Sequence, residues 1–176
     1  MPKIGTHMTE NTLFELSKQI GLALELRGAT LTTAESCTGG WIAKVITDVP
    51  GSSAWFERGF VTYSNQAKQQ LIGVAAQTLE AYGAVSEPVV REMAQGALQA
   101  AEADYAISVS GIAGPDGGSD EKPVGTVWFG FADKQGQTSA ITTCFAGDRD
   151  AVRRQATEFA LQTLLNDFLK NKLDTV

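Results

Sequence analysis

The chain has 176 residues, of which 43% are hydrophobic, and this length and composition fit one globular domain. A formal net charge of −6 and a pI near 4.8 argue against a protein that tracks DNA or RNA, because non-specific nucleic-acid binding needs a basic face. No stretch approaches the roughly 20 apolar residues of a membrane helix, and the start lacks a secretory signal. We therefore expect a cytoplasmic protein that binds neither nucleic acid nor membrane.

Residues 1–7, MPKIGTH, read as a remnant of expression cloning ahead of a natural Met8, so residues 8–176 are expected to form the domain. This interpretation sets aside His7, the only histidine. Cys37 and Cys144 lie far apart without a C-x-x-C pair, which predicts reduced thiols rather than a disulfide framework or a zinc site.

Apolar periodicity and turn residues divide the chain into alternating helices and strands. Helical spacing predicts five helices, at residues 11–27, 39–47, 65–73, 87–103 and 148–170. Runs rich in Thr, Val, Ile and aromatic residues predict about five strands, at residues 29–36, 56–64, 104–111, 125–133 and 138–146.

The connections between these elements predict an α/β fold. Strands separated by helices should be parallel, whereas the short turn near Gly136 predicts an antiparallel hairpin. A mixed, mostly parallel sheet with helices on both faces follows. The longest structureless stretch, residues 111–125, has a length that is often functional in a compact domain.

Ser36 lies in TAESCTGG, residues 33–40, where a strand is followed directly by a helix. One interpretation is a helix N-cap, because a serine oxygen readily accepts a backbone N–H. The other is a ligand site, in which unpaired N–H groups of Cys37, Thr38 and Gly39 bind an oxyanion or a phosphate. The two interpretations are compatible.

A serine nucleophile needs a base, and with His7 set aside a Ser-His-Asp triad is excluded. The remaining candidates are Glu35, Lys44 and Lys68. Lys68 is the best placed, because it follows a strand that could run parallel beside the first and reach the same sheet edge, although a solvated surface lysine is the ordinary alternative. Cys37 is the rival nucleophile, with a small buried packing residue as its structural alternative.

Two further features could hold a ligand. Residues 110–118, SGIAGPDGG, form a glycine-rich turn that lacks the P-loop pattern and is either a ligand contact or a flexible connection. Arg149 and Arg153 lie near the start of the last helix, where the helix dipole disfavours cations. Either Asp148 and Asp150 pair with them, or the guanidinium groups bind a phosphate or a carboxylate.

Several motifs in a fixed order, TTAESCTGG, YSNQAK, AVSEPVV, SGIAGPDGG, KPVGTVWFGF and FAGDRDAVRRQA, resemble those of one family. From about Thr12 to Phe168 the chain resembles the CinA C-terminal domain family, and within it the standalone bacterial nicotinamide mononucleotide deamidases. The resemblance implies a three-layer α/β/α sandwich. It also implies hydrolysis of the carboxamide of nicotinamide mononucleotide to nicotinic acid mononucleotide and ammonia, in pyridine nucleotide recycling, with no metal or cofactor.

The family's motifs imply the roles of particular residues. Ser36 and Lys68 match a Ser/Lys dyad, and Tyr63 of YSNQAK is carried over as a third catalytic residue. Ser110 matches a position that is often Thr in the family, and Arg149 is assigned to the substrate phosphate. Substrate contacts are also expected from residues around these positions, namely Cys37, Thr38, Gly39, Gly111 and Arg153.

Other functions stay open at this point. The alternative from another class is a non-catalytic nucleotide-binding regulatory module of the same fold, and a third possibility is an amidase acting on a related nucleoside or amide. A homo-oligomer, with a dimer favoured, is also expected, because apolar residues such as Trp55 and Phe56 exceed what a small core can hide.

Overall fold

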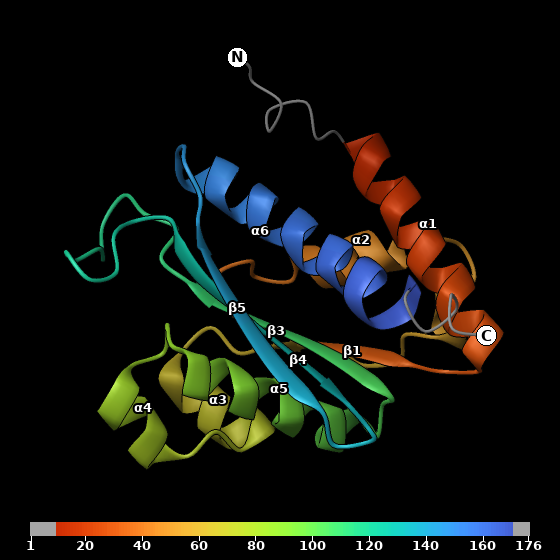
Figure 1. The fold of residues 1–176 in the computed structure, drawn as a ribbon, viewed down its shortest axis with the longest axis horizontal. Coiled ribbons are helices and arrows are strands. Elements are labelled where there is room, and N and C mark those ends of the chain that lie inside the picture. The colour runs from red at the N-terminus through yellow and green to blue at the C-terminus, as the bar shows by residue number, and fades with distance from the viewer. Residues whose placement is uncertain (1–9, 171–176) are drawn as a thin grey trace.

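The computed structural model describes residues 10–170, which are built around one five-stranded sheet (Figure 1). The spatial order of the strands is β2 (Phe60–Val61), β1 (Leu31–Glu35), β3 (Tyr105–Gly111), β4 (Thr126–Asp133) and β5 (Thr138–Cys144). β1 pairs in parallel with β2 and with β3, whereas the β3–β4 and β4–β5 pairs are antiparallel. Of these strands only β4 runs opposite to the rest, which confirms the predicted mixed, mostly parallel sheet.

Helices cover both faces of the sheet, as Figure 1 shows. One face carries α1 (Glu10–Arg27), α2 (Trp41–Thr47) and α6 (Arg149–Thr163), and the other carries α3 (Asn65–Ile72), α4 (Ala76–Tyr82) and α5 (Glu87–Ala101). A short 3₁₀ helix, Ser52–Ala54, follows α2, and a π-helical segment, Leu164–Lys170, continues α6. This arrangement confirms the three-layer α/β/α sandwich. The predicted cloning remnant at residues 1–7 lies outside the described residues.

Two elements differ from those predicted. β2 spans only Phe60–Val61, although residues 56–64 read as a strand. α4 was not predicted, because its only buried residue is Leu79 and one apolar contact gives no helical periodicity. Its start is held from another helix, since the Glu92 carboxylate of α5 accepts hydrogen bonds from the Ala75 N–H at 2.9 Å and the Thr78 hydroxyl at 2.7 Å.

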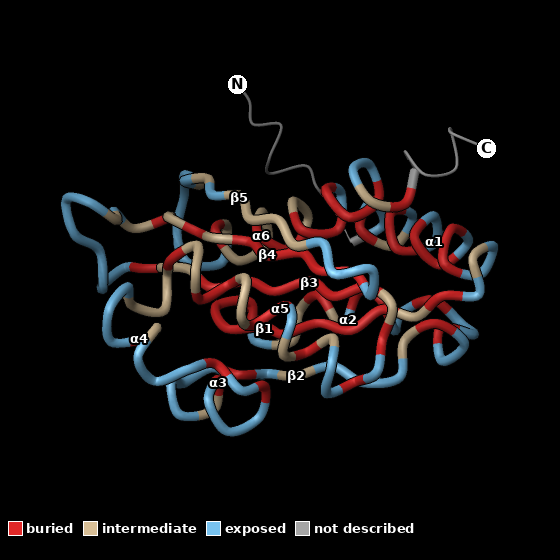
Figure 2. The backbone as a smooth tube through the Cα atoms, turned by 60° about the horizontal axis from the view of Figure 1, so that its bottom comes forward, coloured by how far each residue is buried: buried red, intermediate tan, exposed pale blue. Residues whose placement is uncertain are grey.

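The central strands are the most deeply buried part of the chain (Figure 2). Because side chains alternate along a strand, Ile107 and Val109 of β3 pack toward α1, α2 and α6, while Ser108 faces α5. The Ser108 hydroxyl donates to the Val90 carbonyl of α5 at 2.6 Å. A Cβ on the neighbouring Gly130 would lie 2.3 Å from that same carbonyl oxygen, so glycine is what lets α5 approach the sheet.

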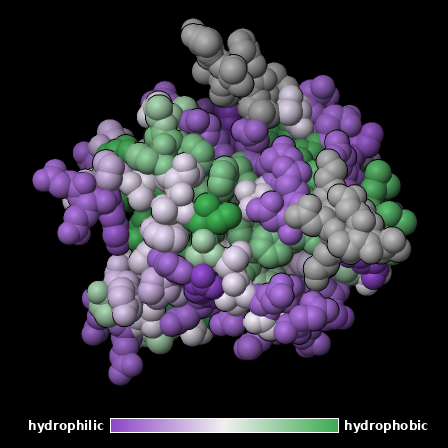
Figure 3. Space-filling view, viewed as in Figure 1, coloured by the Kyte–Doolittle hydropathy of each residue, from purple (hydrophilic) through white to green (hydrophobic). Residues whose placement is uncertain are grey.

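The surface shows where apolar side chains remain exposed. Trp55 is 6% exposed and Phe56 packs against the same core cluster, so neither supplies the surplus apolar surface on which the expected interface was based. The large exposed side chains include Leu22 and Leu26 of α1, and hydrophobic patches lie near α1 and in the middle of the face in Figure 3. In the part of the chain that the structure describes, every helix is too short or too polar to span a membrane.

Candidate active site

Ser36 lies at the carboxyl end of β1, beside the carboxyl end of the parallel strand β3. The Ser36 N–H donates to the Val109 carbonyl at 3.0 Å, so the parallel pairing extends one residue beyond β1. Ser110 and Gly111 therefore lie alongside Ser36. This is the edge at which open α/β sheets gather their ligands.

Lys68 reaches Ser36 from the first turns of α3. Its Nζ lies 2.9 Å from Ser36 Oγ, which matches the separation expected for a dyad. The Lys68 side chain is only 1% exposed, and its Nζ also donates to the Thr62 carbonyl at 2.8 Å and, more weakly, to the Tyr63 carbonyl at 3.4 Å. The parallel pairing of β2 with β1 brings the two residues together, as the sequence predicted.

The surroundings of Lys68 make its neutral form more accessible than that of an ordinary lysine. Burial lowers the pKa of Lys68 from 10.5 to about 8, and the negative charge of a Cys37 thiolate would oppose this shift only in part. Within the described residues no carboxylate forms an ion pair with Lys68. A neutral amine has two N–H groups and one lone pair, so the two carbonyls can take the N–H groups while the lone pair faces Ser36 Oγ.

Ser36 does not cap α2, so the N-cap interpretation is wrong. The N-cap residue is Gly40, and the Glu35 carboxylate receives the N–H groups of Gly40, Ile42 and Ala43 at 2.8 to 3.1 Å. Glu35 is thereby fixed as a structural anchor rather than a base. The Ser36 hydroxyl instead lies 2.9 Å from Lys68 Nζ and donates weakly to the Tyr63 carbonyl at 3.4 Å.

The turn after Ser36 depends on glycine and exposes backbone donors. Gly39 and Gly40 have φ values of 62° and 104°, which other residues rarely adopt. The Gly39 N–H is used within the turn, because it donates to the Ser36 carbonyl at 3.0 Å. In the described part of the chain, the Thr38 N–H makes no backbone hydrogen bond and the Cys37 N–H faces only its own sulfur, so neither is taken up by another residue.

The rival nucleophile and the other candidate base are both unsuited to the chemistry. Burial raises the pKa of Cys37 to about 12, so its thiol stays protonated at neutral pH. Lys44 pairs with Asp48 at 2.9 Å on the exposed side of α2 and lies outside the Ser36 site. Ser36 and Lys68 are the pair that the structure brings together.

A cavity of about 310 Å³ opens beside the dyad. The predicted site residues that line it are Ser36, Cys37, Tyr63, Lys68, Ser110, Gly111 and Arg149. Arg149 is held between two segments, since it donates to the Gly114 carbonyl at 2.7 Å and to the Tyr63 hydroxyl at 3.0 Å. Its guanidinium group thus stands at the cavity with Tyr63.

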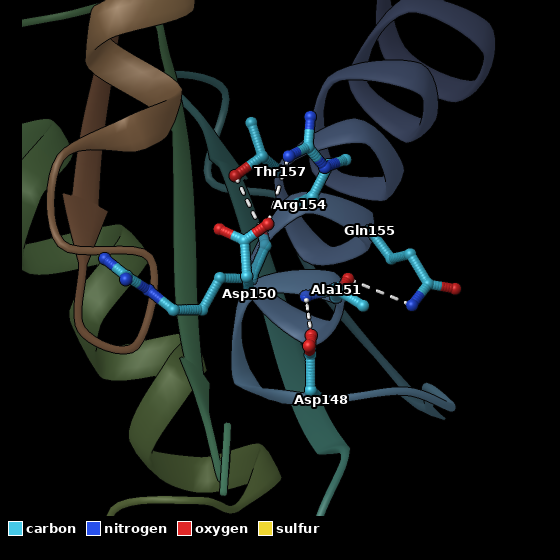
Figure 4. Close-up of polar contacts among 7 residues, drawn as sticks. Asp148, Asp150, Ala151, Arg154, Gln155 and Thr157 are labelled. Carbon is cyan, nitrogen blue, oxygen red and sulfur yellow. Dashed lines mark hydrogen bonds and ion pairs between the residues drawn. The ribbon is translucent and has the colours of Figure 1, made fainter. Parts of the chain in front are cut away.

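The carboxylates near the start of α6 do not pair with Arg149 or Arg153, so that alternative is wrong. Asp148 caps α6 by accepting the Ala151 N–H at 2.9 Å, and Asp150 pairs with Arg154 at 3.0 Å (Figure 4).

Three predicted contacts, Thr38, Gly39 and Arg153, line a different hollow, of about 410 Å³. Arg153 donates to the carbonyls of Cys37 at 2.9 Å and Thr38 at 3.4 Å instead of facing the Ser36 cavity. The structure therefore separates Arg149 from Arg153, although the two lie one helical turn apart.

The CinA C-terminal domain family matches residues 13–168. The chain belongs to that family.

Two relatives and one solved structure resemble this CinA C-terminal domain over nearly their whole length. Nicotinamide-nucleotide amidohydrolase PncC of Escherichia coli (strain K12) is 71% identical over 164 residues, which cover 93% of this chain and 99% of the relative. The protein of the same name from Enterobacter agglomerans is 66% identical over 93% of this chain and 100% of its own. The crystal structure of competence damage-inducible protein A (ComA) from Klebsiella pneumoniae has a TM-score of 0.85 and 45% identity, covering 88% of this chain and 96% of that one.

Some residues lining the cavity of this CinA C-terminal domain were not predicted. They include Asn65, Ala84, Val85, Ile112 and Asp116. Asn65 and Asp116 lie inside the quoted motifs YSNQAK and SGIAGPDGG, so the motifs themselves carried the signal. The described residues contain no group of three or more His, Cys, Asp or Glu side chains arranged to hold a metal ion.

Proposed function

We propose that this CinA C-terminal domain is a nicotinamide-nucleotide amidohydrolase, which converts nicotinamide mononucleotide and water to nicotinic acid mononucleotide and ammonia in pyridine nucleotide recycling. The name of a relative that is 71% identical and covered over 99% of its length supports the activity. The observation that carries the mechanism is the 2.9 Å contact between buried Lys68 Nζ and Ser36 Oγ.

In the first half of the reaction, Ser36 Oγ attacks the carboxamide carbon while neutral Lys68 takes the hydroxyl proton. The electron pair of the carbonyl π bond moves to the carbonyl oxygen, which becomes an oxyanion. The N–H groups of Cys37 and Thr38 stabilise this oxyanion. Removing one such donor typically costs 10²- to 10³-fold in kcat. The C–N bond then breaks, and the departing nitrogen takes the proton held by Lys68, either directly or relayed through the Tyr63 hydroxyl at the cavity wall, to leave as ammonia.

In the second half, water attacks the acyl-serine ester and gives its proton to Lys68. The ester C–O bond breaks, and Lys68 returns the proton to Ser36 Oγ. Lys68 must be neutral at the start of each half, and burial holds its pKa at about 8. The rate is therefore expected to rise with pH, to be half-maximal near pH 8 and to level off about one pH unit higher.

The substrate phosphate is assigned to Arg149, which is the guanidinium group at the cavity. Arg149→Met is expected to lower kcat/KM for nicotinamide mononucleotide by about 100-fold, because a charge-assisted contact to phosphate is lost. Turnover of nicotinamide riboside, which has no phosphate, should change less than about threefold. Steady-state ammonia release with both substrates makes the comparison, and an equal loss on both would contradict the assignment.

Purified protein and nicotinamide mononucleotide are enough to test the function itself. The proposal expects stoichiometric ammonia and nicotinic acid mononucleotide. A non-catalytic regulatory module would instead bind the nucleotide, as calorimetry would show, and release no ammonia. An amidase for a related nucleoside or amide would prefer nicotinamide riboside or nicotinamide to the nucleotide.

Cellular location and assembly are part of the same proposal. Both cysteines are free thiols, which supports a cytoplasmic protein because that compartment keeps thiols reduced. A homodimer stays a prediction, and its support is now the exposed apolar surface at Leu22 and Leu26 rather than Trp55 and Phe56.

A further inference from the structure

The turn that carries the N–H groups of Cys37 and Thr38 is held from two sides. From inside the domain, Glu35 accepts the Thr38 hydroxyl at 2.6 Å and the first N–H groups of α2. Glu35 is 1% exposed, so this anchor is shielded from water. From α6, which lies on the same face of the sheet as α2, Arg153 donates its Nε–H to the Cys37 carbonyl at 2.9 Å and an Nη2–H to the Thr38 carbonyl at 3.4 Å.

The Arg153 side chain donates its hydrogen bonds to these two carbonyls. In the residues that the structure describes, its guanidinium group forms no ion pair, and the nearby Asp150 is paired with Arg154 instead. Arginine suits this task because its donors sit in a planar fork of fixed geometry, which a lysine ammonium lacks.

The contact with the Cys37 carbonyl sets the direction of the next N–H. The only cis peptide in the described residues is Gly114–Pro115, so the Cys37–Thr38 peptide is trans and planar. In such a peptide the C=O and the N–H point in opposite directions. Since the carbonyl points to Arg153, the Thr38 N–H points away from it. Arg153 and the Thr38 residue line the other hollow, whereas Cys37, whose carbonyl Arg153 holds, lines the Ser36 cavity, so the Cys37–Thr38 peptide lies between the two.

We propose that Arg153 is a positioning residue, which aims the Thr38 N–H at the developing oxyanion by holding the preceding carbonyl, and that it does not bind the substrate. This inference rests on the proposed amidohydrolase function. It replaces the sequence-based expectation that Arg153 contacts the substrate.

Arg153→Met tests the role, because methionine fills much of the space and donates no hydrogen bond. We expect kcat for nicotinamide mononucleotide to fall by about 30- to 100-fold, which is part of the 10²- to 10³-fold value of a complete oxyanion donor. KM should stay within about threefold. The fall in kcat should be the same with nicotinamide riboside, because the oxyanion forms on the carboxamide of both substrates.

Two further variants keep the test interpretable. Arg154→Met removes a neighbouring arginine on the same helix that pairs with Asp150 and stacks on Trp41, and its kcat should stay within about twofold of wild type. Arg153→Lys retains the charge but offers no planar fork, so we expect it to recover only part of the lost kcat. Circular dichroism and thermal melting show whether Arg153→Met folds. If it does not, the kcat and KM of Arg153→Lys test the positioning role: a lowered kcat with KM within about threefold supports it, and an unchanged kcat overturns it.

The outcomes separate this proposal from the proposed function. If wild-type protein releases no ammonia, or Ser36→Ala stays active, the amidohydrolase mechanism fails and this role fails with it. If the mechanism holds but kcat of the Arg153 variant stays within threefold of wild type, only the positioning role is overturned. The positioning role would also be overturned if the Arg153 variant raised KM for nicotinamide mononucleotide by tenfold or more but left KM for nicotinamide riboside unchanged. That result would indicate that Arg153 contacts the substrate phosphate.

Discussion

Ser36→Ala is expected to slow ammonia release from nicotinamide mononucleotide by at least about 10³-fold, with little change in KM. Alanine leaves Lys68 and the cavity in place but removes the oxygen that forms the acyl ester. Single-turnover reactions, quenched and examined by intact-protein mass spectrometry, should show a covalent adduct in wild type and none in the variant.

Cys37→Ala is the matched control for that result, because it changes the adjacent residue in the same cavity. With its thiol pKa raised to about 12 by burial, the Cys37 side chain should contribute packing alone, and the variant, which keeps the backbone N–H, should keep kcat within about threefold of wild type. The reverse pattern, with Cys37→Ala inactive and Ser36→Ala active, would show that the Cys37 thiol is the nucleophile.

Lys68→Met is expected to cause a comparable loss of kcat, because no other base touches Ser36 Oγ among the described residues. Residues that act as a unit are strongly non-additive, so the double variant Ser36→Ala/Lys68→Met should be little worse than either single variant. Multiplicative losses in the double variant would mean that the two residues act independently.

The single variant Lys68→Met should also change how the free energy of unfolding depends on pH. Folded Lys68 loses its proton near pH 8, whereas the unfolded side chain keeps it up to pH 10.5. Between these values the unfolded state binds more protons, so the stability of wild type rises with pH. Relative to Lys68→Met, wild type should gain about 2 kcal/mol in unfolding free energy between about pH 7 and pH 9.5, measured by urea denaturation. A flat difference would indicate that Lys68 is charged when folded.

The sheet and the dyad could be predicted because both follow from local patterns. Thr-rich and aromatic runs gave the strands, and parallel neighbours necessarily end at one edge, which placed Ser36 and Lys68 together. The identity of the catalytic pair owed more to the family's motifs, since Lys44 and Lys68 are chemically the same side chain until burial distinguishes them.

What could not be predicted depends on contacts distant in sequence or on competition for the same hydrogen bonds. The start of α4 is held by Glu92, which belongs to another helix. Glu35 takes over the capping of α2, so the N-cap pattern at Ser36 was misleading. Arg153 looked like a ligand for an anion, but its partner is the backbone of a turn more than one hundred residues away.

The central claim is that a buried amine at Lys68 is uncharged often enough to activate Ser36. A pH titration of protein labelled with ¹³C at the lysine Cε, followed by NMR and assigned by the signal missing in Lys68→Met, measures this directly. We predict that one resonance titrates at about pH 8 in the folded protein. A Lys68 resonance that titrates near 10.5, as an ordinary lysine does, would contradict the account.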